Sequence, residues 1–132
     1  MTIKQGNNQM AMAARIAFES PDNHRTASPS RDRPIDLVHL ANQTMGDKAL
    51  EAEILQMFAR QARGLVQEIA IAEAATVTAL AHRLKGSANA VGAFKVSTAA
   101  GRLEAEPGDA ASMATLHSAV IEAENFITGL CR

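Results

Sequence analysis

Apolar residues from position 35 to the C-terminus recur at intervals of three and four, which is the spacing of one face of an α-helix. We therefore predict five helices, at about 36–45, 47–69, 73–91, 93–105 and 110–130. Asp36, Asp47 and Asp109 stand where side-chain carboxylates cap helix N-termini, and Gly92 stands where a helix ends. No stretch alternates polar and β-branched residues, so we predict no strand.

The apolar positions of each predicted helix form a stripe that should be buried. The predicted core residues are Leu37, Leu40, Ala41 and Thr44 in the first helix, Leu50, Ile54, Met57, Phe58, Leu65 and Ile69 in the second, Val96, Ala100 and Leu103 in the fourth, and Met113, Leu116, Val120, Ala123, Ile127 and Leu130 in the fifth. Short connections place consecutive helices antiparallel. The predicted fold is all-α: an antiparallel up-down-up-down four-helix bundle with a short extra N-terminal helix.

The first 33 residues have a different composition. Met10 to Phe18 could form two helical turns, but polar residues punctuated by Pro21 and Pro29 follow them. We predict a flexible N-terminal tail at 1–33 and a helical bundle domain at 34–132; a docking helix within the tail is the alternative.

Composition and charge exclude several classes of function. The 132 residues are rich in Ala, Leu, Ile and Met, lack Trp and Tyr, and carry a net charge of −1, which gives no footprint for nucleic acid or a membrane surface. No apolar run is long enough to cross a bilayer, and the N-terminus does not resemble a signal peptide. Cys131 has no second cysteine to pair with, which suits a reducing compartment. We expect a cytoplasmic monomer.

The third predicted helix, around residues 79–93, has two distinct faces. Its apolar face consists of Val77, Ala81, Leu84, Ala88 and Val91. The opposite face holds His82, Lys85, Gly86 and Asn89. An exposed glycine inside a helix costs about 1 kcal/mol relative to alanine, and close approach by another macromolecule would explain it. This pattern predicts a reactive or docking histidine on the outside of a helical domain.

The residue types on this face suit phosphoryl chemistry. An exposed imidazole is substantially neutral at pH 7, so a ring nitrogen of His82 could act as a nucleophile. Lys85, one turn later, could neutralise part of a phosphoryl group's charge, and Gly86 would leave space for the partner that carries it. Taken singly, these are an ordinary surface histidine, a solvated lysine and a tolerated glycine; only their combination indicates a site.

Neighbouring polar residues are candidates for a docking surface, with solvated side chains as the alternative. Thr78 shares the His82 face, Arg83 and Ser87 flank it, and Asn89 extends it. The remaining histidines, His24, His39 and His117, have no second ligand at metal-binding spacing, so we expect no metal site. The chain also lacks a glycine-rich phosphate cradle and an acidic magnesium pocket, so we expect no autonomous kinase activity.

The run A-H-x-L-K-G-S-A at 81–88, followed by V-G-A at 91–93 and G-R-L-E at 101–104, resembles the signature of histidine-containing phosphotransfer (HPt) domains of two-component phosphorelays. The resemblance implies that His82 accepts a phosphoryl group from a receiver-domain aspartate and passes it to another receiver. The implied partners are response-regulator receiver domains and a (hybrid) sensor histidine kinase. The chain would need no cofactor of its own, with Mg²⁺ expected on the receiver.

One departure from the family pattern lies at residues 70–75, which lack the Gly-Asp punctuation common between the second and third helices. No kinase or receiver segment accompanies the domain, which predicts a freestanding intermediate. Two alternatives stay open: an HPt-like adaptor that binds a receiver without productive transfer, and an unrelated four-helix scaffold with an accidental motif.

Overall fold

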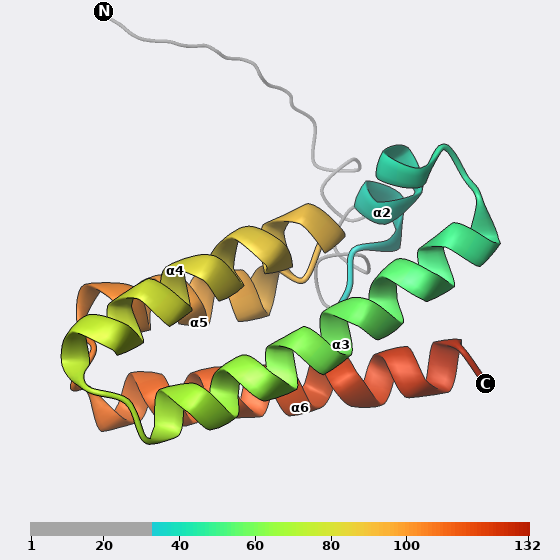
Figure 1. Cartoon of the computed structure of the whole chain (residues 1–132). Helices are drawn as coiled ribbons and strands as arrows, with labels where there is room; N and C mark the ends of the chain where they lie inside the picture. Colours follow the sequence, from blue (N-terminus) through green and yellow to red (C-terminus); the bar gives the residue numbers. More distant parts are fainter. Residues whose placement is uncertain (1–32) are drawn as a thin grey trace, which may run out of the picture. The chain divides into compact units, whose positions relative to one another are not determined.

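The computed structural model describes residues 33–132, which form five α-helices and, within that range, no strand (Figure 1). The helices are α2 (Leu37–Thr44), α3 (Lys48–Ala70), α4 (Ala74–Val91), α5 (Phe94–Ala105) and α6 (Ala110–Leu130). The prediction of an all-α fold is confirmed for this part of the chain, and each predicted helix is present with its ends within two residues. The predicted tail, including Met10 to Phe18 and His24, lies outside the described residues apart from Arg33.

The helix boundaries follow from local capping. Asp36, Asp47 and Asp109 precede α2, α3 and α6, and each carboxylate accepts a hydrogen bond at 3.1 Å from a backbone N–H of the first turn. Such a cap stabilises a helix by about 1 kcal/mol because it satisfies an N–H group without a helical partner. The three aspartate caps predicted from the sequence are therefore confirmed.

Gly92 ends α4 and also joins it to α2. Its backbone has φ = 84°, a left-handed conformation that favours glycine. Its carbonyl accepts a hydrogen bond from the backbone N–H of Asp36 at 2.9 Å, and a Cβ on Gly92 would lie 2.9 Å from the carbonyl oxygen of Asp36. A side chain is thus excluded both by backbone conformation and by space, and the start of α2 is held against the end of α4.

The four longer helices pack in a closed ring: α3 contacts α4 and α6, and α5 contacts the same two helices. Figure 1 shows α4 alongside α5 and α3 alongside α6, with α2 against one end of α3 and α4. The core lies between the four long helices. All five residues of the predicted apolar face of α4 are buried, so the opposite face of that helix is directed outward.

The prediction of which α3 residues are buried in the core is partly wrong. Phe58, Leu65 and Ile69 are buried, but Leu50 is 40% exposed and Met57 56% exposed, and Ile54 is only half-buried. The buried residues of α3 are Glu51, Leu55, Phe58, Ala62, Leu65, Val66 and Ile69. Apolar residues occupy two adjacent stripes of α3, and packing against both α4 and α6 decides which one is buried. In α6, the predicted core residue Leu130 is also exposed.

Candidate functional site

His82 lies on the outer face of α4 with 68% of its side chain exposed. Its helix is fixed from the other side, because Ala81 and Leu84 are completely buried in the core. Lys85, one turn later, is half-buried. The predicted placement of His82 on the outside of the helical domain is therefore confirmed.

A carboxylate from α5 joins His82 and Lys85. Nδ1 of His82 lies 2.8 Å from Oε2 of Glu104, within hydrogen-bond distance, and Nζ of Lys85 forms an ion pair with Oε1 at 2.9 Å. One carboxylate thus bridges both residues that the sequence selected.

Glu104 is the residue of this cluster to which the sequence prediction assigned no role. In the sequence it is the last residue of the G-R-L-E run. It is 22 positions from His82 in the chain and lies on another helix. Helical periodicity reports which residues share a face of one helix, whereas this contact depends on how two helices pack together. The one signal in the sequence that could have indicated Glu104 is that an acidic residue directly follows Leu103, a predicted core residue.

The carboxylate is held in its charged form. The Lys85 ammonium is the main cause that places the pKa of the Glu104 carboxyl below its ordinary value, and the contact with His82 adds to this lowering. Partial burial acts in the opposite direction, since 24% of the Glu104 side chain is exposed. A charged carboxylate accepts hydrogen bonds only, so it assigns the proton of the contacting ring nitrogen to His82 Nδ1. In the neutral imidazole, the lone pair is then on Nε2.

Asn89 is held by α5 as well. Its Oδ1 accepts a hydrogen bond of 2.5 Å from the hydroxyl of Ser97, a buried residue of α5. The sequence prediction placed Asn89 on an exposed docking face, and the residue is exposed. The carbonyl end of its amide is nevertheless engaged within the chain, which leaves the NH₂ group to meet another molecule.

The other predicted docking residues occupy two kinds of position. Arg83 and Gly86 are exposed, whereas Thr78 and Ser87 are half-buried. A Cβ on Gly86 would meet no atom within 4 Å. Packing within the described part of the chain therefore does not require glycine at this position.

A shallow groove lies between α3 and α4, on the side of α4 that holds Ser87. Its volume is about 350 Å³, and it is lined by Ile54, Met57, Phe58, Gln61, Ser87, Ala90 and Val91. The lining is largely apolar, and Met57 contributes an exposed thioether side chain. The groove provides apolar surface on the same helix as His82.

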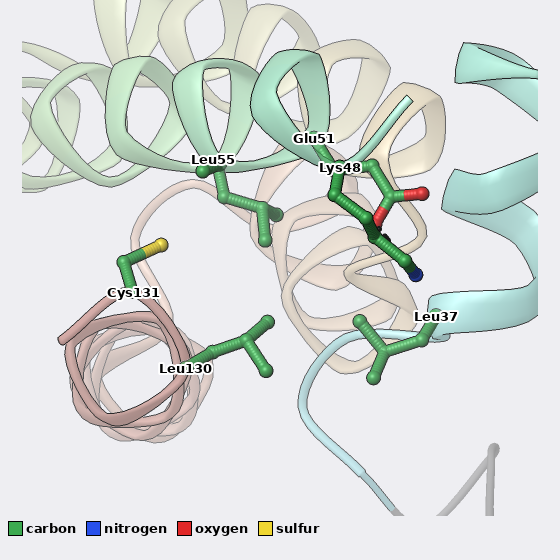
Figure 2. A pocket seen from close by; sticks show the side chains of 7 residues that line it. Leu37, Lys48, Glu51, Leu55, Leu130 and Cys131 are labelled. Atoms are coloured by element: carbon green, nitrogen blue, oxygen red, sulfur yellow. Dashed lines mark hydrogen bonds and ion pairs between the residues drawn. The ribbon is translucent and has the colours of Figure 1, made fainter. Parts of the chain in front are cut away.

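A second hollow lies among α2, α3 and the C-terminal end of α6 (Figure 2). It has a volume of about 290 Å³ and is lined by Leu37, Lys48, Glu51, Ala52, Leu55, Leu130 and Cys131. Its buried carboxylate, Glu51, accepts hydrogen bonds from the Thr44 hydroxyl at 3.1 Å and from the Lys48 ammonium at 3.4 Å. None of its lining residues belongs to α4 or α5, so it is separate from the His82 cluster.

The remaining histidines of the described region lie elsewhere. His39 packs edge-to-face on Phe94 with ring centroids 5.2 Å apart, and its Nε2 is buried without a hydrogen-bond partner among residues 33–132. His117 is exposed on α6. Within residues 33–132, no three His, Cys, Asp or Glu residues are grouped as metal ligands would be. None of the helices in this range is long and apolar enough to cross a membrane.

Comparison with protein families identifies the family to which this chain belongs. The family model for the Hpt domain matches residues 53–126, more than half of the chain, and the matched range includes all of α4 and α5. The chain therefore belongs to the Hpt domain family, as the motif around His82 predicted, and this membership supports a role in two-component phosphorelay phosphotransfer. Comparisons with curated proteins and with solved structures gave no significant match.

Proposed function

We propose that this protein is a phosphorelay intermediate. His82 accepts a phosphoryl group from the aspartate of one receiver domain and passes it to the aspartate of another. The observation that carries the proposal is the cluster of His82, Lys85 and Glu104 on the outer side of an Hpt domain, with contacts of 2.8 and 2.9 Å. A sensor histidine kinase, including the hybrid type that carries its own receiver, would supply the phosphoryl group upstream.

The reaction uses Nε2 of His82 as the nucleophile. Its lone pair attacks the phosphorus of the aspartyl phosphate, a P–N bond forms, and the P–O bond to the aspartate breaks, so that its electron pair returns to the carboxylate. The ring, which keeps its proton on Nδ1, gains positive charge as the bond forms. The charged Glu104 carboxylate at 2.8 Å stabilises that charge. Transfer to the second receiver reverses these steps.

Lys85 has two possible anionic partners in this scheme. In the structure its ammonium pairs with Glu104, and during transfer it would share its charge with the phosphoryl oxygens. The sequence prediction considered only the phosphoryl group. The structure adds a resting partner that keeps the lysine side chain close to His82 before a receiver arrives.

Docking would use the surface around His82. Gly86, Arg83 and Asn89 are exposed on α4, and the groove beside Ser87 adds apolar contact area from α3. Thr78 is the predicted docking residue one turn before His82. Short-lived signalling contacts are small, so a groove and a few polar residues suffice. We expect Mg²⁺ to be bound by the receiver and not by this chain.

We further propose that α3 to α6 form an up-down-up-down antiparallel bundle, with residues 34–132 as the functional domain and residues 1–33 as a tail. The connections between these helices span only residues 71–73, 92–93 and 106–109, and short connections favour antiparallel neighbours. A monomer in the cytoplasm is the expected working form.

The test is phosphoryl transfer from a panel of prephosphorylated receiver domains. His82→Gln should abolish labelling without affecting the fold, because the side chain is largely exposed. His117→Gln, which changes another exposed histidine on α6, is the matched control and should be labelled normally. The label should be lost in acid and kept in base. Full labelling of His82→Gln would refute the assignment, and receiver binding without any labelling of the wild type would favour the adaptor.

A further inference from the structure

A row of residues on α5 contacts a row of residues on α4. On α5, Ser97, Gly101 and Glu104 are spaced by four and three residues, so they share one side of the helix. Ser97 contacts Asn89, and Glu104 contacts His82 and Lys85. Gly101 lies between these two contacts, opposite Lys85.

Gly101 differs from the other glycines inside the described helices. A Cβ on Gly64, Gly86 or Gly129 would meet no atom within 4 Å, whereas a Cβ on Gly101 would lie 3.5 Å from Cδ of Lys85. That distance is ordinary van der Waals contact, so a methyl group would fit. The next carbon of a longer side chain, about 1.5 Å further out, would compete with the lysine stem for the same space. Gly101 is also half-buried and inside α5, where helix propensity disfavours glycine.

We propose that Gly101 is a positioning residue for phosphoryl transfer. Because it has no side chain, the aliphatic part of Lys85 can lie against α5, and this placement directs the Lys85 ammonium to Glu104 and His82. Glu104 follows Gly101 by three residues on the same side of α5, so a lysine stem lying on Gly101 brings Nζ to the carboxylate. The transfer role rests on the proposed function, whereas the placement of Lys85 can be measured without any phosphoryl donor.

The first measurement follows the Glu104 carboxyl carbon by NMR during an acid titration of the unphosphorylated protein. In Gly101→Leu, displaced Lys85 would no longer stabilise the charged carboxylate, so its titration midpoint should rise toward that of Lys85→Ala. Gly101→Ala should keep the wild-type midpoint because a methyl group fits. Gly129→Leu, which makes the same change at an open position of α6, should also keep it. A wild-type midpoint in Gly101→Leu would overturn the proposal.

The second measurement is single-turnover transfer from a phosphorylated receiver. Lys85→Ala should slow transfer about tenfold, the effect of one lost charge-assisted contact at a half-exposed site. Gly101→Leu should slow it to a similar extent, and the double variant should be no slower than Lys85→Ala. Losses that multiply in the double variant would show that Gly101 does not act through Lys85, and would overturn the proposal.

Thermal unfolding followed by circular dichroism checks that each variant folds. Should Gly101→Leu fail to fold, Gly101→Ser adds only one atom beyond Cβ and should raise the Glu104 midpoint by a smaller amount; an unchanged midpoint in that variant would overturn the proposal. Absence of transfer in the wild type would refute the proposed function alone, because the Glu104 titration would still decide how Lys85 is placed.

Discussion

Replacing Glu104 by glutamine tests how the His82 cluster works. The substitution keeps the size and shape of the side chain but removes the charge that lies 2.8 Å from Nδ1 of His82 and 2.9 Å from Nζ of Lys85. A glutamine carbonyl can still accept the Nδ1 proton, so the hydrogen bond is weakened but not deleted. The change therefore isolates the contribution of the negative charge.

The expected loss is about tenfold in the rate of transfer from a phosphorylated receiver. A charge-assisted hydrogen bond is roughly twice as strong as a neutral one, and the ring becomes more positive as the P–N bond forms. Water offsets part of the loss, because His82 is largely exposed and surface charges are screened. The effect should therefore be far smaller than the roughly 10⁴-fold loss seen when a buried carboxylate that orients a catalytic histidine is neutralised.

Single-turnover kinetics with one phosphorylated receiver would measure this loss, and ¹⁵N NMR of His82 would report which ring nitrogen carries the proton. In wild type the Nδ1–H form should dominate, and Glu104→Gln should shift the population toward Nε2–H. Glu122→Gln is the matched control, since Glu122 is also in an ion pair, with Lys95 at 3.5 Å, but on α6. A Glu104→Gln rate within twofold of wild type, with an unchanged tautomer, would refute the role assigned to the charge.

Other predictions follow from the caps, the glycines and the lowered pKa values. Gly92→Ala should reduce the free energy of unfolding, measured in urea, by about 2–4 kcal/mol. The alanine would be strained by the left-handed backbone conformation, and its Cβ would clash with the Asp36 carbonyl. A loss below about 1 kcal/mol would contradict this prediction. Gly86→Leu should leave stability equal or higher, because its Cβ meets nothing within 4 Å, yet weaken receiver binding in titration calorimetry; unchanged affinity would place Gly86 outside the docking surface. Lys85 lowers the pKa of Glu104, and Ser112 lowers the pKa of Asp109. Each lowered pKa stabilises the folded protein at pH values above the ordinary pKa, which is 4.5 for Glu104 and 3.8 for Asp109. This stabilisation is lost as the pH falls through the lower pKa of the folded state. Urea unfolding between pH 6 and pH 3 should show this decline, and Glu104→Gln should make it shallower; an identical decline in the variant would exclude a contribution from Glu104.

Local signals made the helices predictable. The N-caps at Asp36, Asp47 and Asp109 and the left-handed Gly92 are determined by the chemistry of a few neighbouring residues. The apolar face of α4 was also predictable, since small and branched residues occupy one side and polar residues the other. These features place His82 on the outside of the domain without knowledge of the other helices.

Features that depend on how helices pack were not predictable in the same way. Periodicity alone did not decide between the stripe with Leu50 and Met57 and the stripe with Leu55 and Val66, because both repeat at helical spacing. The contact between His82 and Glu104 requires α4 and α5 to pack in one particular register. Neither fact is encoded within a single helix.

The position of the imidazole has a kinetic consequence under the proposed function. His82 lies on one outer face, bordered by Glu104 on the α5 side, while the apolar groove lies between α4 and α3. A donor and an acceptor receiver must each bring an aspartate in line with the same nitrogen, so they cannot occupy the face together. Transfer should then follow ping-pong kinetics, with the phosphorylated protein as the free intermediate. Each unphosphorylated receiver should act as a competitive inhibitor of the other, so the relative abundance of the two receivers would set the rate of signalling.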